Sequence, residues 1–188
     1  MRRSVVFAAF GASESMNAGS WYFLNRSFGS DASNIETMID LFQVGDAGRG
    51  FHAYTASNAD LNLLLDKVSG TLQPLVPKVT ASEPGVSDHR SFYAKGIPSV
   101  MFTTGDIPKV AQRSEDCAFD WMERELEYIY NFVLALMESG APSFDPAERK
   151  AVHSEDAVPW NDCDVKPAFM NNYDPSVFLQ KWVYTYLK

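Results

Sequence analysis

Three polar loops carry residue types that could bind a metal ion or move a proton. They are Gly11–Ser15, Gly45–Gly50 and Ser87–His89. Glu14 offers a carboxylate, and Asp88 beside His89 offers a carboxylate next to an imidazole, which are the groups that bind zinc or transfer protons in hydrolases. Because an α/β sheet places its site at the carboxyl ends of its strands, we expect these loops to meet at one edge of a sheet.

The segments between these loops have the periodicity of alternating strands and helices. Ser4–Phe10 is a continuous apolar run, typical of a strand buried on both faces of a parallel sheet. Further strands are expected at Thr37–Val44, Phe51–Thr55 and Ser99–Thr103, and helices at residues 16–27, Asn58–Leu72, Ser87–Lys95 and Asp120–Glu138. The alternation predicts an α/β three-layer sandwich with a mostly parallel, mixed sheet over residues 1–140.

Two of the helices have apolar faces that can be specified. In Asn58–Leu72 the apolar residues fall at helical spacing, and Ser57 or Asn58 is available as the N-cap. The predicted buried side of Asp120–Glu138 consists of Trp121, Leu126, Ile129, Phe132, Val133 and Leu136. Residues 141–175 are Pro-rich and predict a linker or extended arm, followed by an amphipathic helix at 176–188.

Composition excludes several classes of function. The net charge of −8 over 188 residues argues against a nucleic-acid binder, which needs a basic surface. No apolar run approaches the length of a membrane span, and no secretion signal is visible. Cys117 and Cys163 have no zinc-binding spacing, and whether they pair or stay free thiols is left open.

Four stretches of the chain follow one another in a distinctive order. A strand and turn, Arg3–Glu14, precede a Gly-Ser pair at Gly19 that opens a helix, and Met38-Ile-Asp-Leu-Phe-Gln-Val-Gly45 follows. Further on come Ser87-Asp-His-Arg-Ser-Phe92 and then Gly96-Ile-Pro with an apolar strand ending at Gly105. Residues 111–117 precede the closing helix. Across residues 2–137 this order resembles the di-zinc aminopeptidase family that also contains the glutaminyl cyclases, metallopeptidase family 28.

The resemblance implies a zinc-exopeptidase-type fold, but it does not carry the zinc chemistry over. The family's general base falls on Ser13, and its second glutamate, a metal ligand, is retained as Glu14. The ligand aspartate of the strand Met-Ile-Asn-Leu-Asp falls on Phe42, and the late ligand histidine on Gln112. Two further ligands lie upstream of the first matching strand in the family, and we expect both to be missing here. Zinc, the cofactor of the parent family, is therefore not expected.

Three other polar residues match family positions that support the site without binding metal. They are Asp88, His89 and Asp116. We expect them to fix loops by hydrogen bonding. The resemblance thus favours a non-catalytic domain that binds a peptide or protein partner in the former cleft.

Other interpretations remain open. An active zinc aminopeptidase would need ligands supplied from outside this chain. A nucleophile elbow at Gly11–Ser15 is disfavoured, because Ser15 replaces the closing glycine and no acid and base are placed to serve Ser13. A structural fragment would expose an unpaired sheet edge and could self-associate through it.

The C-terminal segment has a separate resemblance. Lys166–Met170 followed by Asp174–Lys188 looks like the opening of the C-terminal domain of TonB-type energy transducers. That resemblance implies a bacterial cell-envelope protein facing the periplasm. Its alternative is an ordinary amphipathic helix that buries Phe178, Trp182 and Leu187.

Overall fold

A single mixed sheet forms the centre of the fold. The computed structural model describes residues 3–12, 17–27, 34–46, 50–56, 58–71, 75–80, 87–105 and 118–143. Its strands are β1 (Met38–Phe42), β2 (Phe51–Tyr54), β3 (Lys78–Thr80) and β4 (Ser99–Thr104), in the order β1-β4-β2-β3. β1 runs parallel to β4 and β2 parallel to β3, whereas β2 and β4 are antiparallel. The predicted mostly parallel, mixed sheet is confirmed.

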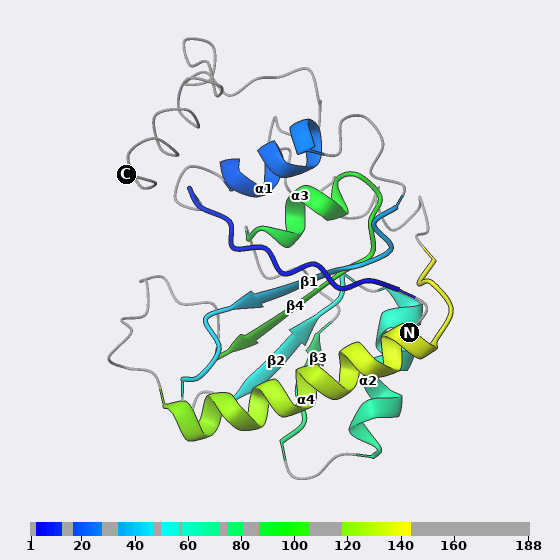
Figure 1. Ribbon diagram of the computed structural model, residues 1–188. Helices are drawn as coiled ribbons and strands as arrows, with labels where there is room; N and C mark the ends of the chain where they lie inside the picture. Colours follow the sequence, from blue (N-terminus) through cyan, green and yellow to red (C-terminus); the bar gives the residue numbers. More distant parts are fainter. Residues whose placement is uncertain are drawn as a thin grey trace. The chain divides into compact units, whose positions relative to one another are not determined.

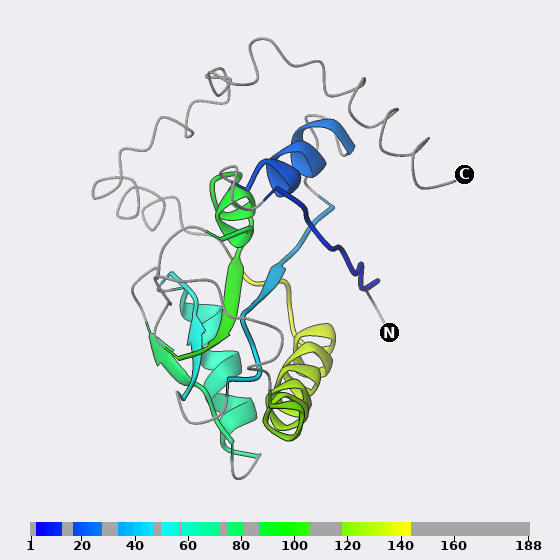
Figure 2. The same ribbon diagram turned by 90° about the vertical axis from the view of Figure 1, so that its left-hand side faces the viewer.

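Helices cover both faces of this sheet. α2 (Ala59–Ser69) and α4 (Phe119–Glu138) pack on one face, while α1 (Ala18–Tyr22) and α3 (His89–Tyr93) lie on the other (Figures 1 and 2). α1 continues as a short π-helical turn, η2 (Phe23–Ser27). The predicted three layers are therefore present. None of the helices in the described ranges has the length and apolarity that crossing a bilayer requires.

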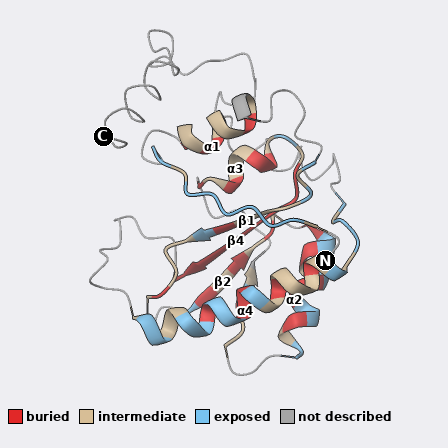
Figure 3. Ribbon diagram, viewed as in Figure 1, coloured by how far each residue is buried: buried red, intermediate tan, exposed pale blue. Residues whose placement is uncertain are grey.

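The larger core lies between the sheet and the pair α2 and α4. Asn58, one of the two N-caps that the sequence offered, caps α2, because its side chain accepts a hydrogen bond from the Leu61 amide at 3.0 Å. The apolar stripe of α2, spaced at i, i+3, i+4 and i+7, is buried as expected (Figure 3). It consists of Leu61, Leu64, Leu65 and Val68. The rings of Phe51 and Phe102 stack on each other. Phe51 meets Tyr128 of α4 edge to face, and Phe102 meets Phe132 in the same way.

The buried side of α4 differs from the predicted one at three residues. Leu126 is 39% exposed, whereas Glu125 and Tyr128 are buried together with Ile129, Phe132 and Leu136. The face of α4 that turns inward is the one that carries Tyr128, whose large ring enters the core, and Glu125, which has polar partners there. The prediction for Leu126 was wrong.

The N-terminal run Ser4–Phe10 is not a strand. It passes along the outer side of β1 but makes no backbone hydrogen bond to any part of the chain that the structure describes (Figures 1 and 2). Phe7 is 95% exposed and Val6 71%. The predicted buried strand was wrong because apolar, β-branched sequence reports strand propensity, not the presence of neighbours on both sides.

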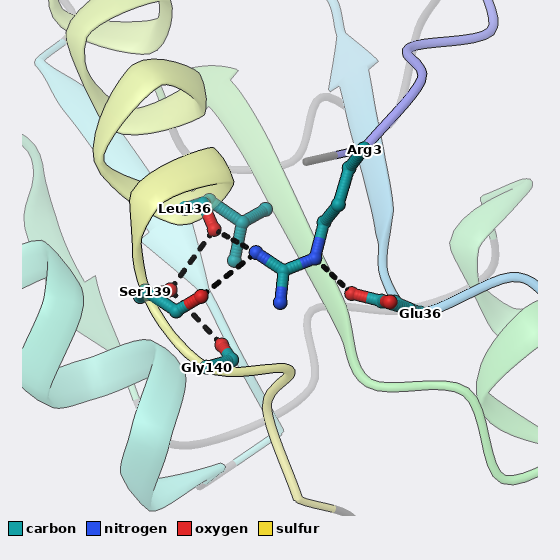
Figure 4. A network of polar contacts seen from close by, with 5 residues as sticks. All are labelled: Arg3, Glu36, Leu136, Ser139 and Gly140. Atoms are coloured by element: carbon teal, nitrogen blue, oxygen red, sulfur yellow. Dashed lines mark hydrogen bonds and ion pairs between the residues drawn. The ribbon is translucent and has the colours of Figure 1, made fainter. Parts of the chain in front are cut away.

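Both ends of this segment are nevertheless anchored. The guanidinium of Arg3 pairs with Glu36 and donates to the carbonyls of Leu136 (2.7 Å) and Ser139 (2.8 Å) at the end of α4 (Figure 4). Since these carbonyls have no partner within the helix, a cation there is favourable. At the other end, Phe10 packs against Phe23, as part of a smaller core under α1 and α3.

Candidate functional site

The face of the sheet that carries α3 is the candidate site. Side chains alternate along a strand, so Asp40 and Phe42 of β1 point to the same face, and Ile39 points to the α4 core. Asp40 contacts α3, which identifies this face. β1 and β4 run in parallel, so the loops that follow them leave at the same edge of the sheet.

Asp40 and His89 form a buried pair across this face. The backbone amide of His89 donates to Oδ2 of Asp40 at 3.2 Å, and Nδ1 of His89 lies 2.9 Å from the same oxygen. Asp40 is 7% exposed and His89 5%. One carboxylate oxygen thus holds the first residue of α3 through both its main chain and its ring.

The electrostatics of the pair place a hydrogen on the ring nitrogen that faces Asp40. Burial acts to raise the pKa of Asp40, but hydrogen bonds from His89 and Ser87 and the positive charge of a protonated His89 together hold that pKa below its ordinary value. The carboxylate is therefore an acceptor only, and Nδ1 of His89 carries the hydrogen between them. Asp88, half-buried, occupies the N-cap position of α3.

The loop that holds Ser13 and Glu14 lies outside the described residues, but its two ends are fixed. The amide of Ala18 donates to the carbonyl of Ala12 at 3.3 Å, which closes the loop. A Cβ on Gly19 would lie 2.3 Å from the carbonyl oxygen of Gly11, so glycine is required where α1 crosses the end of the N-terminal segment. This close approach accounts for the glycine of the Gly-Ser pair noted in the sequence.

Backbone strain is concentrated around the same positions. Outside glycine, positive φ angles occur at Ala12 (60°), Asn17 (55°), Gln43 (52°) and Ala56 (48°) in the described ranges. Ala12 and Asn17 flank the loop with Ser13 and Glu14, and Gln43 directly follows Phe42. Such conformations cost about 1–3 kcal/mol each and are often found at functional sites, so three of the four support this edge as the candidate site, whereas Ala56 follows β2.

The loop after β1 is hydrogen-bonded to α4 and to the residue that directly precedes this helix. The Gly45 amide donates to Oε2 of Glu125 at 2.7 Å, and the Ala118 amide donates to the Gly45 carbonyl at 2.8 Å. Gln112 and Asp116 belong to the stretch between Gly105 and Ala118 and lie outside the described residues, so their positions are not part of the described site.

Sequence reasoning found some of these residues and missed others. It identified His89 and Phe42 but not Asp40 or Glu125, which are the partners that fix the site's loops. Two features of the sequence could have identified Asp40 and Glu125. Asp40 is a charge in the middle of an apolar strand, at the position where the resembling family has asparagine. Glu125 is a charge four residues after Trp121 and three before Tyr128, on the buried stripe of α4.

The described residues do not fit a zinc ion. Phe42, at the end of β1, presents an apolar ring without a lone pair. In the part of the chain that the structure describes, no three His, Cys, Asp or Glu side chains come together in a way that could hold a metal. The chemistry that this arrangement supports is hydrogen bonding at a rigid, polar sheet edge.

Comparison with known proteins places this geometry in context. The family model described as Peptidase family M28 matches residues 1–137. An aminopeptidase from Aneurinibacillus sp. strain AM-1 is 24% identical, with a TM-score of 0.49, over 72% of this chain and 33% of its own length. A zinc aminopeptidase from Bacillus subtilis is 16% identical, with a TM-score of 0.52, over 72% of this chain and 37% of its own length. The chain thus spans about a third of these structures. No curated protein sequence matches it significantly.

Proposed function

Because the chain belongs to peptidase family M28, we propose that it is a zinc-aminopeptidase-type domain that does not hydrolyse peptides and instead binds a peptide or protein partner. The observation that carries this proposal is Phe42. It stands at the end of β1, where the family pattern has a ligand aspartate, and it shares a face with the buried pair Asp40 and His89. A phenyl ring at that point removes a metal donor and places an apolar group beside the polar pair.

Two sequence positions support the loss of catalysis. Ser13 stands where the family has its general base, and a serine hydroxyl does not accept a proton at neutral pH. Gln112 stands at the late histidine ligand, and a neutral amide is a poor substitute for imidazole. Of the family base and ligand positions that fall within this sequence, Glu14 alone keeps its side-chain donor. One carboxylate among these positions does not hold zinc tightly.

Hydrolysis of leucine p-nitroanilide tests the catalytic half of this proposal. We expect the full chain to show no activity above a no-protein blank, with or without added zinc chloride. Chelator-sensitive release of p-nitroaniline that survives a second chromatographic step would contradict it. A zinc aminopeptidase assayed in parallel is the positive control.

Binding is tested by the amide signals around the site. We expect L-leucinamide, which presents a free amino terminus as a peptide does, to shift the NMR signals of His89 and Gln43 and not those of α2. Saturable shifts would support a retained peptide site. Their absence with leucinamide and with a leucine-containing tripeptide would contradict it.

The second candidate function is an active zinc peptidase completed by ligands from outside this chain. It is favoured by one observation, that the solved zinc aminopeptidase matched here is about three times as long as the matched region. Zinc-dependent hydrolysis that appears only when the flanking reading frame is expressed with this chain would establish it.

Two further proposals concern partners and location. The run Ser4–Ala9 is exposed beside the edge strand β1, and two copies would associate if their runs paired with each other as strands. The resemblance of residues 166–188, which lie outside the described residues, to TonB-type transducers supports a place in the bacterial cell envelope. Fractionation of cells that express the full reading frame tests the location: recovery in the cytosol contradicts it.

A further inference from the structure

Glu125 is a completely buried carboxylate that the family pattern does not explain. It lies on the inner face of α4 and is 0% exposed. Charged side chains are almost never buried to this extent unless they are paired or hydrogen-bonded, because leaving them unsatisfied is costly. Its hydrogen-bond partners therefore indicate its role.

Three donors from three separate segments converge on this carboxylate. Oε2 accepts the backbone N–H of Gly45 at 2.7 Å. Oε1 accepts the hydroxyl of Thr104 at 2.7 Å and the indole N–H of Trp121 at 3.0 Å. The Gly45 amide also points to Oγ1 of Thr104 at 3.0 Å, so that these groups form a closed ring. The loop after β1, the end of β4 and α4 meet in this ring.

The segments held in the ring are those that shape the site. Gly45 has a φ of 99°, and its carbonyl accepts from the Ala118 amide at 2.8 Å. Within the same loop the Gln43 carbonyl accepts from the Thr104 amide at 3.3 Å. The loop that begins at Phe42 is thus tied to Thr104 and Ala118, which lie just outside the two ends of the segment carrying Gln112 and Asp116.

We propose that Glu125 is the positioning residue of this site: its carboxylate sets the loop after β1 and ties it to the end of β4 and the start of α4. Its role does not depend on whether the site binds a peptide or a metal. Replacing the carboxylate by an amide leaves one acceptor oxygen in place of two, so the N–H of either Gly45 or Trp121 must face the new NH2 group. The loop should then loosen locally, while the core of α4 stays packed.

Because the Glu125 carboxyl can be protonated, its hydrogen bonds to the loop should depend on pH. Burial raises the pKa of Glu125 above its ordinary value, the hydrogen bonds from Thr104, Gly45 and Trp121 oppose that rise, and the charge of Asp46 in the same loop adds to it. On α4, Arg124 lies over the ring of Trp121, 5.4 Å from its centroid. Protonation would convert one acceptor oxygen into a donor, so the ring should weaken as the pH falls through the pKa of this carboxyl.

Amide hydrogen exchange in the full chain tests the proposal. We expect E125Q to speed exchange at Gly45 and Ala118 by roughly tenfold or more, with exchange at Phe132 in the α4 core changed far less. E127Q is the matched control, since it removes the same charge from an exposed position of the same helix and should change none of these amides.

Two results would overturn the proposal. One is unchanged exchange at Gly45 in folded E125Q, and the other is an equal change at all amides, which indicates a general loss of stability. If E125Q does not fold, a pH titration of the wild-type chain followed by NMR tests the proposal instead. Its Gly45 amide shift should then titrate with the side-chain carboxyl carbon of Glu125, at one midpoint above 4.5. Independent titration of the two signals would contradict the proposal.

Discussion

Nδ1 of His89 lies 2.9 Å from Oδ2 of Asp40, and this buried contact joins the start of α3 to the middle of β1. The same oxygen accepts the backbone amide of His89 at 3.2 Å. The pair fixes the polar face of the sheet two residues before Phe42. The face therefore keeps a defined hydrogen-bonded geometry beside a position that has no metal-binding side chain.

Substitutions at Asp40 should separate charge from hydrogen bonding. D40A removes one partner of a buried pair, and we expect it to lower the free energy of unfolding by about 3–5 kcal/mol. D40N restores an acceptor and the residue of the family pattern, so its cost should be much smaller. Urea unfolding at pH 7 measures both values. Equal costs for D40A and D40N would show that the hydrogen bond to His89 contributes nothing.

The stability of the wild-type chain should also depend on pH through this pair. The pKa of Asp40 is lowered in the folded state, so its contribution is present above the ordinary value of 3.8 and is lost as the pH falls through the folded value. The stability difference between wild type and D40N should therefore shrink below pH 3.8. A difference that stays constant from pH 7 to pH 3 would contradict this assignment.

Gly19 should be intolerant of any side chain. Its Cβ would lie 2.3 Å from the Gly11 carbonyl oxygen, so we expect G19A to cost about 1–3 kcal/mol in thermal or urea unfolding. Gly140 is the matched control, because a Cβ there meets nothing within 4 Å and G140A should be close to neutral. If both substitutions have the same effect, the crossing of α1 over Gly11 is not as tight as described.

The exposed N-terminal run should control self-association. We expect the molar mass of the wild type in sedimentation equilibrium to rise with concentration from 21.0 kDa, and F7K to remain at the monomer mass. L63K is the control, since Leu63 is also exposed, at 70%, but lies on the outer face of α2. A wild type that stays monomeric at all concentrations, or an equal effect of L63K, would refute pairing through Ser4–Ala9.

Periodicity predicted most elements of this fold because most of them bury one face. The apolar spacing of α2 is a local property and was predicted, and its Asn58 cap is one of the two that the sequence offered. Ser4–Phe10 was mispredicted because its burial depends on which strands lie beside it, and that is a property of the whole sheet. The three-residue strand β3 was not predicted, since it is too short for a periodic pattern.

The site was less predictable than the fold. Family positions identified Phe42 and His89, but the partners of His89 and Gly45 come from side chains 49 and 80 residues away in sequence. A buried charge on an apolar stripe, as at Glu125, indicates a polar partner without naming it. Ser13, Glu14, Gln112 and Asp116 lie outside the described residues, so the interpretation of their roles still rests on the sequence.

Zinc content tests the central claim most directly. Elemental analysis of the full chain after dialysis against micromolar zinc should find well under one zinc per chain. The variant F42D/Q112H, which returns two family ligands to stand with Glu14, should retain markedly more. About one or two zinc ions per wild-type chain, released by a chelator, would contradict the claim that this site no longer binds the metal.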